Sequence, residues 1–113
     1  MAQNRKKLVD LFVGNISNAI VHNILEKAIS DEEIADKYRR ELSISWEIAK
    51  KYRDKINPVR AALPDKDLQH IKTSIMKKVR AELMLRISKG YENINLNLIE
   101  ELVNEALKDM KIA

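Results

Sequence analysis

The stretch 8-LVDLFVGNISNAIVHNILEKAI-29 decides the fold, because its apolar residues run almost all the way round a helical wheel. One set is wide enough to face the other helices of its own bundle: Val9, Phe12, Val13, Ile16, Ile20 and Ile24. A second set recurs at alternating spacings of three and four residues, as in a heptad repeat, and we call it the seam: Leu11, Gly14, Asn18, Val21, Leu25 and Ala28. A helix with two apolar faces needs one more neighbour than the outer helix of a bundle has.

Two kinds of neighbour satisfy this need, and the sequence leaves both open. The helix over residues 5–29 can lie at the centre of its own chain, or the seam can pack against a partner chain. Gly14 and Ala28 are small enough for close approach, and Asn18 would set the register of a partner helix at some cost in stability. The second alternative predicts a homo-oligomer or a complex with another helical protein.

Composition indicates one folded, all-α domain over residues 1–113. Hydrophobic residues make up 45% of the chain and charged residues 34%, which is the balance of a globular protein. Two glycines and two prolines are few for a β-rich fold, which needs turn residues between short strands. Helical periodicity and short connections then predict a small bundle of about four helices, mostly antiparallel.

The second helix is expected over about residues 31–56, and its start carries a capping box. Ser30 is the expected cap, Glu33 returns the bond, and Ile29 packs on Ile34. Its inward residues recur at helical spacing: Ile34, Tyr38, Leu42, Ala49, Tyr52 and Ile56.

The third and fourth helices follow the prolines. Pro64 introduces the third helix, Gly90 ends it, and its inward face is Leu68, Ile71, Ile75, Val79, Leu83 and Ile87. The alternation in "NINLNL" imitates a strand without a partner, so Asn95 or Asn97 is expected to cap the fourth helix, with Glu100 completing a capping box in the second case. That helix should turn inward Leu98, Leu102, Val103, Ala106 and Met110.

No motif indicates catalysis, a metal or a cofactor. The absence of cysteine excludes disulfides and thiolate sites. A di-iron bundle needs two acid-x-x-His motifs, whereas the nearest approach, Asp67 to His70, occurs once. The pair Glu33 and Asp36 is likewise single, and no glycine-rich loop or nucleophile elbow is present. We expect no catalytic residue, no metal, no cofactor, and a structural role for both His22 and His70 on packed helices.

Nucleic-acid binding is the runner-up function. Arg39, Trp46, Lys50 and Arg53 fall within one sector of the second helix, and an aromatic residue among cations is typical of proteins that bind single strands. The opposing interpretation is that Trp46 lies at the edge of the core under the aliphatic stems of Arg and Lys. A net charge of +4 without tighter clustering favours this second interpretation.

The apolar start of the chain raises the question of a membrane. Arg5, Lys6 and Lys7 precede it as in a signal peptide, but Asp10 and Asn15 interrupt it, and we expect no segment with the length of a membrane span. The prediction is a soluble cytoplasmic protein that acts by association without catalysis; a helical enzyme with no recognisable motif is the third alternative.

Overall fold

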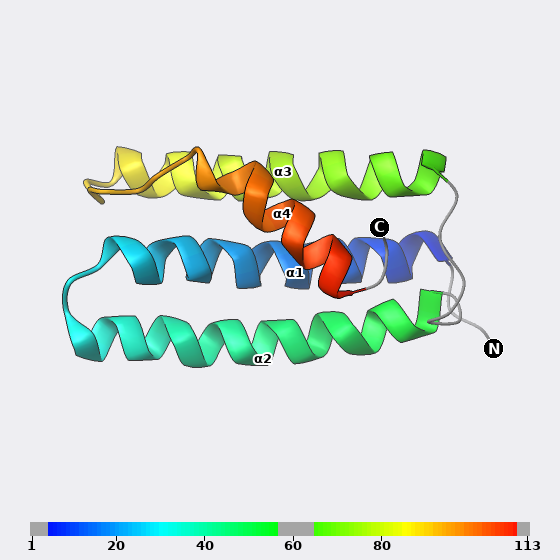
Figure 1. Cartoon of the computed structure of the whole chain (residues 1–113), viewed down its shortest axis with the longest axis horizontal. Helices are drawn as coiled ribbons and strands as arrows, with labels where there is room; N and C mark the ends of the chain where they lie inside the picture. The colour runs from blue at the N-terminus through cyan, green and yellow to red at the C-terminus, as the bar shows by residue number, and fades with distance from the viewer. Residues whose placement is uncertain (1–4, 57–64, 111–113) are drawn as a thin grey trace.

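The computed structural model describes residues 5–56 and 65–110 and contains four helices (Figure 1). They are α1 (Arg5–Ala28), α2 (Glu32–Ile56), α3 (Asp65–Ser88) and α4 (Leu98–Asp109). The described residues contain no strand, and "NINLNL" lies in the connection that leads into α4. The all-α class and the approximate bounds of the helices are therefore confirmed.

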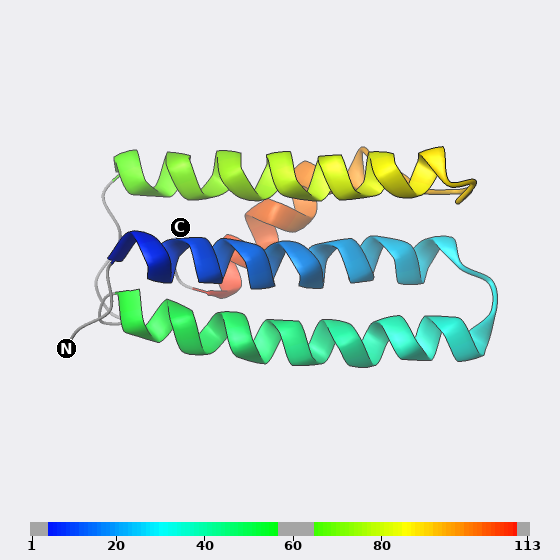
Figure 2. The same cartoon turned by 180° about the vertical axis from the view of Figure 1, so that it is seen from behind.

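α1 is the central helix. Helices α2, α1 and α3 lie side by side in one layer, and α4 crosses one face of that layer obliquely (Figures 1 and 2). α1 packs against all three other helices, whereas the backbone of α2 approaches neither α3 nor α4. α1 is antiparallel to α2 and parallel to α3 (Figure 1). This arrangement follows from the sequence of α1, which carries apolar residues on more sides than any other helix.

The core is built on α1, α3 and α4. Phe12, Ile16 and Ile24 of α1 are buried, as the wide apolar face predicts. α3 and α4 bury against them the predicted residues Ile71, Ile75, Val79, Leu83, Leu102, Val103, Ala106 and Met110. α2 contributes two fully embedded alanines and several half-buried side chains, because it packs along α1 alone. For the same reason Ile34, predicted to face inward, is 45% exposed.

The predicted caps of α2 and α4 need correction. Asp31, not Ser30, caps α2: its Oδ1 accepts hydrogen bonds from the amides of Glu33 (2.9 Å) and Ile34 (3.3 Å). Asn97 occupies the cap position of α4 without a side-chain cap bond, and the Oδ1 of Asn95 instead accepts from the Asn97 amide at 3.0 Å. In both places a side chain near the predicted cap, Asp31 or Asn95, accepts the backbone hydrogen bond.

The end of α3 is partly as predicted. Gly90 stops the helix in the left-handed conformation, with φ of 99°, which a residue without a Cβ adopts at little cost. Ile87, expected on the inward face, is 37% exposed, because the last turn of α3 extends beyond the core.

The expectation about membrane length is wrong for α1. The segment Lys6–Ala28 has 23 residues and contains an 18-residue stretch with a mean hydropathy of 1.3, so by length and composition alone it could cross a membrane. In the structure α2 and α3 flank this helix and α4 crosses one of its faces, and just over half of the stretch is buried. Packing within the chain therefore accounts for part of the apolar character of α1.

Candidate interaction surfaces

The structure divides the predicted seam into a covered half and an open half. Leu25 is 0% exposed and Val21 is buried too, and both belong to the chain's own core. Leu11, Gly14 and Ala28 are half-buried, and Asn18 is exposed. The central position of α1 therefore accounts for Val21 and Leu25, which corrects the expectation that all six residues are available to a partner. Surface for a partner is left chiefly at Leu11, Gly14 and Asn18.

The open half of the seam lies in a groove between α1 and α3, which we call the α1–α3 groove. Its volume is about 590 Å³. Leu11, Gly14 and Asn18 line it from α1, and Lys78, Ala81 and Leu85 from α3. The Leu85 side chain is 48% exposed. The groove is a mixed surface in which apolar and polar side chains alternate.

Gly14 leaves the backbone of α1 accessible in this groove. A Cβ added at Gly14 would meet no heavy atom within 4 Å. One turn further along, Ser17 lines the groove with a buried Oγ that forms no hydrogen bond with a described residue. Glycine in a helix interior weakens the helix by about 1 kcal/mol relative to alanine. The surrounding packing of the chain therefore does not require a glycine at this position.

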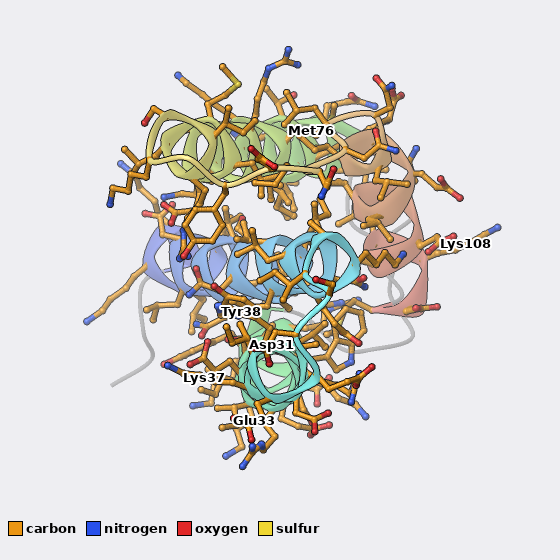
Figure 3. The ribbon with its side chains drawn as sticks, turned by 90° about the vertical axis from the view of Figure 1, so that its left-hand side faces the viewer. Asp31, Glu33, Lys37, Tyr38, Met76 and Lys108 are labelled. Atoms are coloured by element: carbon orange, nitrogen blue, oxygen red, sulfur yellow. The ribbon has the colours of Figure 1, made fainter. Side chains whose placement is uncertain are left out.

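A group of hydrogen-bonded side chains, centred on Arg86, connects α3 to α2 across α1, and we call it the polar bridge. Arg86 of α3 donates from Nη1 to the Tyr38 hydroxyl of α2 at 3.5 Å and to the Tyr91 hydroxyl at 3.4 Å. Its Nε donates to Glu82 at 3.1 Å. Because α1 lies between α2 and α3, the bond from Arg86 to Tyr38 must pass over α1. Figure 3 shows Tyr38 between the α1 and α2 ribbons.

His22 of α1 joins this bridge from below. Its ring stacks on Tyr38 with centroids 5.6 Å apart, and its Nε2 lies 3.2 Å from an Oε2 of Glu41. Burial lowers the pKa of His22, and the neighbouring Glu41 carboxylate opposes that shift. Its Nδ1 is buried and forms no hydrogen bond with a described residue. His22 does not line the α1–α3 groove, and its contacts with Tyr38 and Glu41 join α1 to α2.

The four residues of the predicted nucleic-acid face do not form one surface. Arg53 is 1% exposed, and its Nε donates to the Met110 carbonyl oxygen at 2.9 Å, which fastens the end of α4 to α2. Arg39 is exposed but pairs with Glu26 at 2.9 Å and with Asp36. Trp46 packs against the core. Lys50 is exposed. Of the three predicted cations, Lys50 is therefore the one that is neither buried like Arg53 nor paired with carboxylates like Arg39.

Arg53 was assigned to the nucleic-acid face because of its charge, although its position in the inward stripe of α2 indicates burial. Arg53 follows Ala49 by four residues and precedes Ile56 by three, so it occupies the inward stripe of α2. A charged residue at an inward position needs a buried hydrogen-bond acceptor, and the carbonyl groups at the end of a helix are such acceptors. Spacing on the helical wheel was the signal that could have identified it.

The residues considered for metal binding are dispersed. Glu33 and Asp36 are exposed on the outer face of α2. His70 is exposed near the start of α3, so the expectation that it packs in the structure is wrong. Within residues 5–56 and 65–110, no three side chains of histidine or of the acidic residues gather closely enough to hold a metal ion.

Comparisons with models of protein families, with curated proteins and with solved structures give no match to this chain. Its function is therefore inferred from the arrangement of its own side chains.

Proposed function

We propose that this protein functions by association, without catalysis, and that it forms a homodimer through the α1–α3 groove. The single observation that supports this proposal is the accessible backbone at Gly14, flanked by Leu11 and Asn18 on α1 and by Ala81 on α3. Small residues allow two helices to approach closely. A second helix in the groove would also cover the exposed part of Leu85.

The charges of the groove favour a second copy as the partner. Asp10 and Lys78 both line it, and neither forms an ion pair with another described residue. In a two-fold dimer the same patch meets itself, so that Asp10 of each copy can face Lys78 of the other. A patch that carries both signs is self-complementary, whereas a patch of one sign would repel its own copy.

The test combines light scattering with substitutions at Gly14. We expect the wild-type mass to be that of a dimer at micromolar concentration, and Gly14→Gln to be a folded monomer. The monomer fold should accept glutamine because open space surrounds the position, and loss of glycine strengthens the helix by roughly 0.5 to 1 kcal/mol. Gly14→Ala, which adds one methyl group, should weaken the dimer much less.

Asn104→Gln provides a control on the exposed face of α4 and should leave the mass unchanged. A wild-type mass that remains monomeric at several hundred micromolar would contradict the proposal. So would a Gly14→Gln variant that is as dimeric as the wild type.

Nucleic-acid binding has less support as a second function. It needs Arg53 and Arg39 on a common surface with Trp46, but Arg53 is buried and Arg39 is paired with two carboxylates. Electrostatic attraction to phosphate requires cations that are free to release counterions.

A further inference from the structure

A second groove lies on the other side of α1, between α2 and α4, and we call it the α2–α4 groove. Its volume is about 400 Å³. Three helices supply its apolar lining: Ala19, Ile20, Leu42, Trp46, Leu102 and Ala106. Ala19, Ile20 and Ala106 are buried and form its base, while Leu42 and Trp46 are half-buried on α2. Apolar surface is thus concentrated here more than in the α1–α3 groove.

The groove exists because α4 crosses the layer obliquely. α2 and α4 both pack on α1 but their backbones do not approach each other. They converge where Arg53 donates to the Met110 carbonyl oxygen, and α4 diverges from α2 toward its own start (Figure 1). The groove is therefore a wedge closed at one end. On α2 its lining extends from Arg39 to Trp46, which corresponds to about two helical turns or roughly 11 Å.

Charge is distributed unequally along the two rims. Glu105 and Asp109 line the groove from α4, and neither forms an ion pair with another described residue. Arg39 lines it from α2, but its guanidinium already pairs with Glu26 and Asp36. The α4 rim is thus acidic and uncompensated, whereas the charge on the α2 rim is neutralised within the chain. An occupant with cations on one flank would complement this pattern.

We propose that the α2–α4 groove binds a short amphipathic helix of a partner protein, with apolar residues toward Ile20 and Trp46 and Lys or Arg toward Glu105 and Asp109. Insertion of an apolar helix face into a groove between helices is an established form of peptide recognition. A length of about two turns provides for apolar anchors three or four residues apart. This site is independent of the proposed dimer, because the two grooves lie on opposite sides of α1.

Trp46 makes the proposal directly testable, because it is the only tryptophan of the chain and it lines the groove. The probe is a capped amphipathic peptide of about four turns, with leucine on one face and lysine on the other, titrated into the full chain. We expect the Trp46 emission to shift to shorter wavelength as the peptide covers the indole. A twin peptide with glutamate in place of every lysine should bind at least about tenfold more weakly.

Two variants with the same net charge separate the groove from general attraction. Glu105→Lys removes a carboxylate from the groove rim and should weaken the lysine peptide by about two- to fivefold, which is the range for one exposed pair. Glu92→Lys changes the charge equally in the exposed connection before α4, and should bind like the wild type.

The proposal is overturned if the lysine peptide leaves the Trp46 emission unchanged at several hundred micromolar. Equal affinity for both peptides, or equal loss in both variants, would also overturn it. An emission shift on simple dilution of the protein, with no peptide present, would assign the groove to a second copy of this chain instead. None of these results depends on whether Gly14→Gln changes the mass.

Discussion

Replacement of Arg53 by methionine should destabilise the protein by detaching the end of α4 from α2. The methionine side chain keeps most of the aliphatic stem, so the change removes chiefly the guanidinium. Arg53 is 1% exposed, and this burial lowers its pKa. Its bond to the Met110 carbonyl oxygen, at 2.9 Å, is one contact that accommodates the buried charge.

The expected loss can be worked out from the bond. A hydrogen bond to a charged group contributes about 1.5 to 3 kcal/mol to stability. For a chain of this size, 1 kcal/mol corresponds to roughly 3 to 5 °C in Tm, so Arg53→Met should lower Tm by roughly 5 to 15 °C. Because the bond lies at the end of α4, the substitution should speed up amide hydrogen exchange in α4 more than in α1 and α3, relative to the wild type.

Thermal unfolding followed by circular dichroism measures the first effect, and hydrogen exchange measures the second. Lys50→Met is the matched control, because Lys50 is exposed on the same helix and should cost less than about 0.5 kcal/mol. A Tm of Arg53→Met within 2 °C of the wild type, by the same conversion less than about 1 kcal/mol, would refute the reasoning. It would mean that desolvation of the guanidinium cancels the bond, as happens for some buried charges.

Further predictions concern the helix cap, pH and nucleic acid. Asp31→Ala should lower the free energy of unfolding by about 1 kcal/mol in a denaturant titration, because the Asp31 side chain accepts hydrogen bonds from the first amides of α2. Ser30→Ala should lower it by less than about 0.5 kcal/mol. The reverse order would restore Ser30 as the cap. Burial lowers the pKa of His22 below its ordinary value near 6.5, so the unfolded chain binds that proton more tightly. The contribution of neutral His22 to stability should be fully present above about pH 6.5 and should decrease as the pH falls from that value toward the lower pKa of the folded state. A His22→Asn variant with the same pH profile as the wild type would exclude this assignment. A labelled single-stranded oligonucleotide should not bind at tens of micromolar, roughly the range of non-specific contacts; steeply salt-dependent binding that Trp46→Ala abolishes would revive the nucleic-acid alternative.

Local spacing along the chain was enough to predict the helices and most of the core. Apolar residues at three- and four-residue spacing identify a helix and its buried face, because that spacing is a local property of the chain. Phe12, Ile75 and Val103 were predicted in this way and are buried. The excess of apolar residues around α1 was also visible, and a central helix was one of the two explanations that it left open.

The neighbour that each face of a helix meets could not be predicted from local spacing and became visible only in the folded chain. Leu25 and Leu11 belong to the same heptad-like seam, yet Leu25 is in the core and Leu11 borders an open groove. Both residues hold the same position of the heptad, so their different burial comes from tertiary packing around α1 and not from local spacing. Arg53 likewise became a buried anchor because α4 ends beside it. Periodicity is set by a residue's near neighbours, whereas burial depends on which distant segment reaches that face, and local spacing carries no information on that pairing.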